Sequence, residues 1–346
     1  MKKICLLATG GTIACVPSER GYVPGLSGSE LLHLVPELAE LADISVIDVK
    51  QVMNIDSSEM QVSDWITLAR ACQRLRDSYD GLVITHGTDT MCYTAAALSF
   101  MLSNLKIPII LTGAMKPLTA EVTDARANLL DAFIAVTEAQ PGVEMVFNHK
   151  LIHGSRAFKM YSQNWDAYVS RNYPLLGTIE EGHLQTRHTA KINETGPDLF
   201  TGLDENVFLL KLTPATSPAV LDYIAEDDYH GLVIEGFGTG GISNLNRGMA
   251  AGLRRFHEQL GIPVIMISQC PYDGVDLAVY GIGEDASQAG VISGNDMTTE
   301  AALVKLMWAL GQTRDLKEIR QLIECNICDE ISPRRLEAWE AKCYNN

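Results

Sequence analysis

Short apolar runs alternate along the chain with longer stretches in which apolar residues recur at helical spacing. Apolar runs bounded by turn residues indicate buried strands, and apolar positions three and four residues apart indicate amphipathic helices. In the first half of the chain the predicted strands are 3–8, 44–50, 81–85, 107–111 and 144–147. The predicted helices are 29–41, 62–77, 90–103 and 124–138, with Ser63 and Asp124 as N-caps. This alternation is typical of a doubly wound parallel sheet.

The pattern changes in the second half. It loses its period after about residue 158, and the polar segment 187–204 is interpreted as an exposed hairpin and linker. A second α/β pattern follows, with strands at 207–212, 231–235 and 264–267 and helices at 218–226, 247–260, 298–310 and 316–324. We therefore expect an α/β protein with a larger N-terminal domain (1–190) built on a doubly wound, mostly parallel sheet. A linker (191–206) and a smaller C-terminal α/β domain (207–346) would follow.

The net charge of the chain disfavours two classes of binding partner, nucleic acids and anionic membranes. The 346 residues include 43 Asp and Glu against 27 Lys and Arg, a formal net charge of −16. Nucleic acids and anionic membranes are bound by clustered cations, so neither is an expected partner. No apolar run approaches the roughly 18 residues that a membrane helix requires.

The cysteines and the N-terminus bear on cellular location. Most of the eight cysteines lie within apolar runs, which favours reduced thiols in a cytoplasmic protein. The start Met1-Lys2-Lys3 resembles a signal peptide, but polar residues interrupt the apolar stretch at Thr9. A signal sequence needs about 7–15 apolar residues. We interpret this segment as a buried strand ending in a glycine turn, and we predict a cytoplasmic location.

Two glycine turns carry hydroxyl groups. Thr9-Gly10-Gly11-Thr12 follows the first predicted strand, and His86-Gly87-Thr88-Asp89-Thr90 follows the third. Ligands bind at the carboxyl ends of parallel strands, so both turns should converge with 112–115. A hydroxyl beside such a turn can attack a carbonyl carbon while backbone N–H groups stabilise the oxyanion. Taken alone, the first turn is more often an ordinary connection, and Asp89 and Thr90 could simply cap a helix.

A threonine hydroxyl needs a base before it becomes a nucleophile. Tyr22 lies in a loop bounded by glycine and proline, ten residues after Thr12, and Lys159 follows the fifth predicted strand. A deprotonated lysine beside Asp89 could pass a proton through Thr88. Without the other motifs, a packed loop tyrosine and a surface lysine are the simpler interpretation.

Together these motifs resemble the two active-site signatures of the asparaginase/glutaminase family. The segments 9–14, 56–58, 86–90, 112–115 and 124–128, together with Tyr22, stand in the family's order and spacing. The resemblance extends over most of the chain and is closest to the bacterial type I, cytoplasmic L-asparaginases. It implies an amidohydrolase.

The resemblance implies that L-asparagine is hydrolysed to L-aspartate and ammonia through a threonine-linked β-aspartyl acyl-enzyme. Thr12 would attack the side-chain amide, and Tyr22 would assist its activation. Thr88, Asp89 and Lys159 would form a second, triad-like relay. Backbone N–H groups of Thr12 and Thr88 would stabilise the oxyanion.

The same resemblance implies how the substrate is held. Ser58 would bind the α-carboxylate and Asp89 the α-ammonium, with Thr88 beside them and Ala114 lining the pocket through its backbone. Glu59 stands where the periplasmic branch carries Gln, and it would help to hold the ammonium. No metal or organic cofactor is implied. The implied assembly is a homodimer, or a homotetramer built as a dimer of dimers, with sites near the subunit junction.

Two segments of the second half leave questions of specificity and regulation open. In the family, the segment that corresponds to 236–241 approaches the site of a neighbouring subunit. Thr239 in this segment stands where many relatives carry Asn. Glutamine is one methylene longer than asparagine, a difference that pockets discriminate only about 10–200-fold, so weak glutaminase activity stays open. Ser268-Gln269-Cys270 resembles a wall of the regulatory asparagine site of some type I relatives. Phe158 is too large and apolar for a polar contact made there, so allostery also stays open.

Two further motifs have weaker chemical interpretations. Segment 236–241 matches G-x-G-x-x-G after a strand, but the acidic residue expected about 20 positions on is Glu258, within a predicted helix, which disfavours dinucleotide binding. Cys325 and Cys328 form a lone C-x-x-C without the second pair of a zinc site. The histidines form no metal-binding motif, so no metal site is predicted.

Two alternatives to a free L-asparaginase remain at this stage. One is the asparaginase-like subunit of a tRNA-dependent amidotransferase, for which we would expect an additional N-terminal domain and a basic surface. The other is a non-catalytic amino-acid sensor that has kept the pocket. The intact set of Thr12, Tyr22, Thr88, Asp89 and Lys159 disfavours the sensor.

Overall fold

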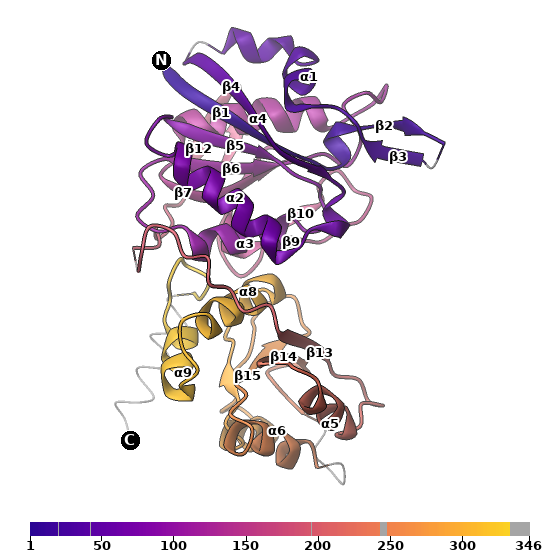
Figure 1. The fold of residues 1–346 in the computed structure, drawn as a ribbon, viewed down its shortest axis with the longest axis vertical. Helices are drawn as coiled ribbons and strands as arrows, with labels where there is room; N and C mark the ends of the chain where they lie inside the picture. Colours follow the sequence, from indigo (N-terminus) through magenta and orange to yellow (C-terminus); the bar gives the residue numbers. More distant parts are fainter. Residues whose placement is uncertain (20, 42, 195, 243–247, 333–346) are drawn as a thin grey trace. The chain divides into compact units, whose positions relative to one another are not determined.

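The computed structural model describes residues 1–346 apart from 20, 42, 195, 243–247 and 333–346. The chain divides into two compact units, Met1–Thr201 and Gly202–Asn346 (Figure 1). Within the described residues, no helix is both long and apolar enough to cross a bilayer. No disulfide joins the seven cysteines in this part of the chain.

The first unit is built on an eight-stranded sheet. Its strands are β1 (Lys2–Gly10), β4 (Ile44–Ile55), β5 (Gly81–Thr85), β6 (Pro108–Thr112), β7 (Gly142–Phe147), β8 (Lys150–His153), β11 (Gly177–Glu180) and β12 (His183–Thr186). They are ordered β12-β11-β8-β7-β6-β5-β1-β4. The five from β7 to β4 are parallel, and β8, β11 and β12 add antiparallel pairs. Every residue of β5 and β6 is buried, as expected of parallel strands covered on both faces.

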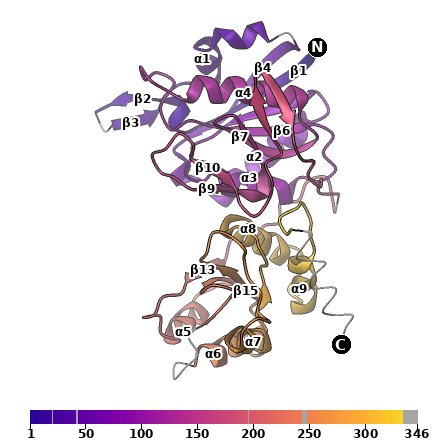
Figure 2. The ribbon, with the colours of Figure 1, turned by 180° about the vertical axis from the view of Figure 1, so that it is seen from behind.

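Helices cover both faces of this sheet. They are α1 (Gly28–His33), α2 (Val62–Leu75), α3 (Met91–Met101) and α4 (Ala125–Glu138), with 3-10 turns η1 (Thr12–Ala14), η2 (Pro36–Glu40), η3 (Ser57–Glu59) and η4 (Gly154–Arg156). Helices α2 and α3 lie on one face and α4 and α1 on the other (Figures 1 and 2). The core on the α4 side includes Ile4, Leu6, Ile110 and Phe133. This arrangement confirms the predicted doubly wound fold.

Two local predictions were wrong, and a third is confirmed only in position. The helix expected over 29–41 is divided into α1 and η2, because Pro36 lacks the N–H that would continue the helix. Helix α2 begins after Gln61, not at Ser63, and the Asp64 carboxylate accepts the N–H of Gln61 at 2.9 Å. Asp124 does occupy the N-cap position of α4, but its side chain does not cap the helix.

Short hairpins fill the region where the sequence pattern breaks down. There, β9 (Ala157–Lys159) pairs with β10 (Tyr168–Ser170), and β11 pairs with β12. A further hairpin near the N-terminus pairs β2 (Cys15–Ser18) with β3 (Gly21–Pro24). The hairpin expected within 187–204 lies earlier, at 177–186. The following segment runs beside the end of α3, where the N–H of Phe200 donates to the carbonyl of Met101 at 2.8 Å.

The second unit contains a four-stranded parallel sheet ordered β13-β14-β15-β16. Its strands are β13 (Val207–Lys211), β14 (Gly231–Gly236), β15 (Val264–Ser268) and β16 (Ile292–Ser293). Its helices are α5 (Ala219–Glu226), α6 (Met249–Glu258), α7 (Gly281–Gln288), α8 (Thr299–Leu310) and α9 (Leu316–Glu324). The sequence pattern predicted all of these elements except α7 and β16. The start predicted for α6, residue 247, lies outside the described residues.

A buried carboxyl group lies within the large sheet. Glu144 of β7 is only 4% exposed, and its Oε2 atom has no hydrogen-bond partner among the described residues. Its register neighbours are Ile110 on β6 and His153 on β8. Burial raises the pKa of Glu144 from 4.5 to about 8, because an apolar environment disfavours the charged form.

We expect the substitution Glu144→Gln to remove part of the pH dependence of stability. The folded protein keeps the Glu144 proton up to about pH 8, whereas the unfolded chain releases it near pH 4.5, so the free energy of unfolding falls as pH rises between these values. Between pH 6 and 7.5 the loss is about 2 kcal/mol. Urea unfolding over this range measures it, with exposed Glu121→Gln as the matched control. Equal slopes for wild type and Glu144→Gln would contradict the assignment.

Candidate active site

The two glycine turns meet at the carboxyl ends of β1 and β5. Gly11 has a φ of +77°, and a Cβ built on it would lie 2.2 Å from the backbone nitrogen of Gly87. A Cβ on Gly87 would in turn lie 3.1 Å from the Cα of Gly11. Only residues without a side chain allow the two backbones to approach so closely. The predicted convergence of these turns is confirmed.

Thr88, Asp89 and Lys159 form one polar cluster. The Lys159 ammonium on β9 donates to the Thr88 hydroxyl at 2.9 Å and to Asp89 Oδ1 at 2.5 Å. The Lys159 side chain is 16% exposed, whereas that of Asp89 is 67% exposed. The ammonium therefore lies behind the threonine hydroxyl, and one edge of the carboxylate remains open to solvent.

Two buried residues to which the sequence analysis gave no role, Tyr168 and His86, bind carbonyl groups of the Thr88 turn. Tyr168 on β10 is 1% exposed, and its hydroxyl donates to the carbonyl of Thr88 at 2.5 Å. Burial raises the pKa of Tyr168 well above its usual value, so the phenol stays a donor. Tyr168 pairs directly with Lys159 in the β9–β10 register. One hairpin thus contacts both the hydroxyl and the carbonyl of Thr88.

His86 supports the same turn in its neutral form. Its Nδ1 lies 2.7 Å from the carbonyl of Gly87, and its Nε2 lies 2.9 Å from the hydroxyl of Thr94. Because a carbonyl only accepts, we assign the proton to Nδ1 and an acceptor role to Nε2. Burial lowers the pKa of His86 to about 4, so the imidazole is uncharged at neutral pH. His86 is a positioning residue for the turn.

The turn after β4 is fastened to the Thr88 turn through Ser57. The Ser57 hydroxyl accepts the N–H of Asp89 at 3.2 Å, and its carbonyl accepts the hydroxyl of Thr90 at 2.7 Å. The next two residues, Ser58 and Glu59, are exposed. The Ser58 hydroxyl donates to the side chain of Asp56 at 2.7 Å. The bonds of buried Ser57 thus hold Ser58 and Glu59, the two residues predicted to bind substrate, beside the cluster.

The loop after β6 completes this end of the sheet. Ala114 is fully buried, and a Cβ on the preceding Gly113 would lie 3.6 Å from the Thr88 methyl group. The Asp124 carboxylate accepts the N–H groups of Met115 and Lys116 at 2.8–3.1 Å. Asp124 therefore caps the loop beside the site instead of its own helix, which is why the predicted N-cap bond is absent.

Thr12 and Tyr22 are less constrained than the cluster. Thr12 begins η1, is half-buried, and its hydroxyl makes no hydrogen bond with any described residue. Tyr22 lies on the β2–β3 hairpin that follows η1, and it is 59% exposed without a hydrogen bond to any described residue. The structure therefore does not join these two side chains by a hydrogen bond, whereas it does join Thr88, Asp89 and Lys159.

The motifs singled out in the second unit, around Thr239, Gln269 and Cys325, include residues that form hydrogen bonds within the fold. Segment 236–241 begins at the last residue of β14, and the carbonyl of Thr239 accepts the N–H of Asp276 at 3.0 Å. The Gln269 amide bridges the carbonyls of Leu212 and Glu235 at 2.6 and 2.8 Å. Cys325 is exposed and Cys328 is buried. Across the described part of the chain, no three His, Cys, Asp or Glu side chains gather as metal ligands do.

Both units match family models. Residues 3–192 match the model for the N-terminal domain of asparaginase, and residues 206–323 match the glutaminase/asparaginase C-terminal domain.

Among curated proteins, the chain is 42% identical to the L-asparaginase of Thermococcus kodakarensis over 95% of this chain and 99% of that one. It is 35% identical to L-asparaginase 1 of Escherichia coli, with 96% and 98% covered. It is also 36% identical to a glutamyl-tRNA(Gln) amidotransferase subunit of Methanobrevibacter smithii, over 96% of this chain and 78% of that relative.

Solved structures agree with the sequence relatives. The thermostable L-asparaginase from Thermococcus kodakarensis matches with a TM-score of 0.89 at 41% identity, covering 95% of this chain and 99% of that one. A "probable cytoplasmic L-asparaginase" from Campylobacter jejuni matches with a TM-score of 0.81 at 30% identity, covering 93% and 99%. With family models over both units and relatives this similar along nearly its full length, the chain belongs to the asparaginase family of amidohydrolases.

Proposed function

We propose that this protein is an L-asparaginase, which hydrolyses the side-chain amide of L-asparagine to L-aspartate and ammonia. The observation that carries the proposal is the contact between the two glycine turns, with the Lys159 ammonium behind one of their threonines. Acyl transfer needs a nucleophilic hydroxyl and a proton carrier close together, and the proximity of these turns to Lys159 supports such a reaction. Membership of the family supports the reaction class.

We propose a two-step reaction with a threonine-linked β-aspartyl acyl-enzyme. Thr12 Oγ1 attacks the amide carbon, the C–N bond breaks, and the nitrogen leaves as ammonia after taking up a proton. Water then attacks the ester and releases L-aspartate, which restores the Thr12 hydroxyl. Tyr22 assists the first proton transfer from its exposed hairpin. Thr88 exchanges a proton with Lys159, whose ammonium Asp89 holds in place.

The substrate-binding roles follow the charges at the site. The open edge of the Asp89 carboxylate binds the α-ammonium, with Glu59 beside it. Ser58 binds the α-carboxylate by exchanging its present bond to Asp56 for one to the substrate. The backbone of Ala114 lines the pocket, and N–H groups of Thr12 and Thr88 stabilise the oxyanion.

Ammonia release from L-asparagine and L-glutamine, measured side by side on purified protein, tests the function. We expect turnover of asparagine and weaker turnover of glutamine. Mass spectrometry after an acid quench should detect an added aspartyl group on the peptide that contains Thr12. Binding of asparagine without turnover would contradict the proposal and favour a sensor.

A second candidate is an ammonia-supplying component of a glutamyl-tRNA(Gln) amidotransferase. The 36% identity to the relative from Methanobrevibacter smithii supports it, whereas the net charge of −16 disfavours a tRNA-binding surface. The ammonia assay separates the two candidates. A free asparaginase releases ammonia at full rate alone, and an amidotransferase component should need its partner and charged tRNA.

We also propose a cytoplasmic location and a homo-oligomeric state, either a dimer or a dimer of dimers. The absence of a disulfide among the seven described cysteines and the "cytoplasmic" relative of Campylobacter jejuni support the location. Fractionation of the source cells and sedimentation of the purified protein test these two statements.

The substitution Tyr168→Phe should lower kcat about tenfold, the effect of losing a buried hydrogen bond worth about 1.4 kcal/mol. The ring would keep its edge-to-face packing on Phe147, while the carbonyl of Thr88 would lose its donor. Because the substrate ligands are untouched, KM should change much less than kcat. Tyr173→Phe, which loses a bond to His188 outside this cluster, is the matched control. A tenfold change in KM at constant kcat would contradict a positioning role.

A further inference from the structure

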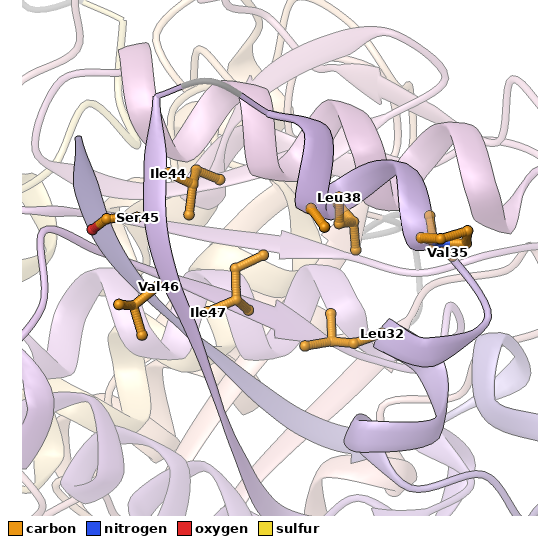
Figure 3. A pocket seen from close by; sticks show the side chains of 9 residues that line it. Leu32, Val35, Leu38, Ile44, Ser45, Val46 and Ile47 are labelled. Atoms are coloured by element: carbon orange, nitrogen blue, oxygen red, sulfur yellow. The ribbon is translucent and has the colours of Figure 1, made fainter.

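Two surface features of the first unit lie outside the residues assigned to the reaction. One is an apolar groove of about 320 Å³ between α1–η2 and β4, and Ser45 is the one polar residue among the nine that line it (Figure 3). The other is the tip of the β9–β10 hairpin, residues 160–167, which directly continues the strands that carry Lys159 and Tyr168. The groove offers no charged group, whereas the hairpin tip can act on the reaction through these two residues.

The β9–β10 hairpin is too short to hold its own position. It has three paired residues per strand, and an isolated two-stranded hairpin is marginally stable at best in water. Its tip is open to solvent, with Tyr161 49% and Trp165 41% exposed. The Asn164 amide oxygen accepts the N–H of Asp166 at 3.0 Å, a bond that stays within the tip. The position of the two functional side chains therefore depends on contacts between the hairpin and the rest of the unit.

An ion pair joins the hairpin tip to the large sheet. The Lys150 ammonium on β8 donates to Asp166 Oδ1 at 2.5 Å, and the two side chains are 25% and 43% exposed. The backbone of Lys150 is paired on both sides, with Phe147 of β7 and Thr178 of β11, so the ammonium extends from a fixed strand. Asp166 lies only two residues before Tyr168, so the pair fixes the start of β10.

A second group supports the Asp166 carboxylate. The side chain of Asn148, in the turn between β7 and β8, also bonds to it, and the Asn148 N–H donates to the buried Asn128 side chain at 2.9 Å. Burial raises the pKa of Asp166, but the bonds from Lys150 and Asn148 outweigh this effect and hold the pKa below its usual value of 3.8. The carboxylate is therefore charged at neutral pH, as a lysine ammonium ordinarily is.

We propose that the Lys150–Asp166 ion pair is a latch for the β9–β10 hairpin. The latch holds the hairpin where Lys159 and Tyr168 reach the Thr88 turn. Lys150 and Asp166 are then positioning residues for the reaction, and the proposal rests on the asparaginase function proposed above. A displacement of a catalytic group by about 1 Å can lower the rate about 100-fold, whereas a partly exposed ion pair contributes little to stability. Loss of the latch should therefore lower the rate far more than it lowers stability.

The substitution Lys150→Met removes the charge of the latch and keeps a side chain of similar length. We expect kcat for asparagine to fall about three- to tenfold and KM to change less than about twofold, because the predicted ligands Ser58 and Glu59 lie on another turn. The midpoint of urea unfolding should stay close to that of the wild type. Lys150→Arg, which keeps a cationic donor, should retain most of the rate. A merely structural contact would instead lower stability and leave kcat unchanged.

The substitution Lys3→Met is the matched control. The Lys3 ammonium lies 3.5 Å from the Asp48 carboxylate, their side chains are 43% and 42% exposed, and Lys3 lies at the start of β1, at the other end of this strand from the site. Its loss should leave kcat unchanged. The double variant Lys150→Met/Tyr168→Phe should lose less activity than the product of the two single losses, because both changes act on the Thr88 turn.

Hydrogen exchange tests the latch without the use of activity. Amides of 157–159 and 168–170 should exchange faster in Lys150→Met than in the wild type or in Lys3→Met. Unchanged kcat or unchanged exchange in Lys150→Met, or equal losses in Lys150→Met and Lys3→Met, would overturn the latch. A wild type that releases no ammonia would instead overturn the proposed function, and the exchange measurement would still decide whether the ion pair holds the hairpin.

Discussion

Replacing Thr12 by alanine is expected to lower kcat for asparagine by at least about three orders of magnitude, as the loss of a catalytic nucleophile does in related acyl-transfer chemistry. Alanine removes the oxygen that would form the ester and leaves the backbone turn intact. KM should change little, because the predicted ligands of the substrate, Ser58 and Asp89, remain. Ammonia release measures kcat, and Thr12→Ser, which keeps a hydroxyl, is the matched control.

The same experiment on Thr88 separates the two threonines. Thr88 also carries a hydroxyl, at the carboxyl end of β5, and this hydroxyl accepts a hydrogen bond from the Lys159 ammonium. The Thr12 hydroxyl has no such donor among the described residues. Thr88→Ala should also be nearly inactive, so activity alone does not identify the nucleophile. In the wild type, the aspartyl group trapped by an acid quench should lie on the peptide that contains Thr12. Near-normal activity of Thr12→Ala, or an aspartyl group found on the Thr88 peptide, would contradict the nucleophile assignment.

The second large effect concerns stability of the C-terminal unit. Lys305 on α8 and Glu330 have no exposed side-chain surface, and their charged atoms lie 2.5 Å apart. The ammonium also donates to the carbonyls of Ile323 and Cys325 at 2.8 and 2.6 Å. The Glu330 carboxylate accepts backbone N–H groups from the C-x-x-C segment. This ion pair therefore holds the segment after α9 against α8.

Lys305→Met should destabilise this unit by about 3–5 kcal/mol, because it leaves the Glu330 charge buried without its counter-ion. The double variant Lys305→Met/Glu330→Gln should recover part of this loss, since it removes the uncompensated charge as well. Hydrogen exchange of the α8 amides over a series of urea concentrations reports on the unit. Exposed Lys317→Met is the matched control. A loss below about 1 kcal/mol in the single variant would show that the pair contributes little.

The hydrophobic pattern determined the larger elements because they are long and strongly periodic. Strands such as β5 and β6 are continuous apolar runs, and α9 has an apolar face at helical spacing. The hairpins of 157–186 have three or four residues per strand, too few for a period to be recognised. For this reason the hairpin predicted within 187–204 was misplaced.

The candidate site divides in the same way. Glycine turns directly after strands indicated where Thr12 and Thr88 lie, because strand polarity places such turns at one edge of a parallel sheet. Tyr168 and His86 were missed because a lone tyrosine and a histidine within a motif carry no local signal of the partners they bind. Asp124 has the sequence context of a helix cap, and only the proximity of the loop after β6 gives it other donors.

The sequence by itself determined the order of strands and helices, the placement of the hydroxyl-bearing turns and the family, since these depend on neighbours close along the chain. The tertiary structure decided which side chains meet across 70 residues or more, as Lys159 meets Thr88 and Tyr168 meets the carbonyl of the same residue. Such contacts depend on the packing of a short hairpin against a distant strand end. No local pattern of polar and apolar residues encodes that packing, because each hydrogen bond is satisfied by a partner that only the folded chain brings near.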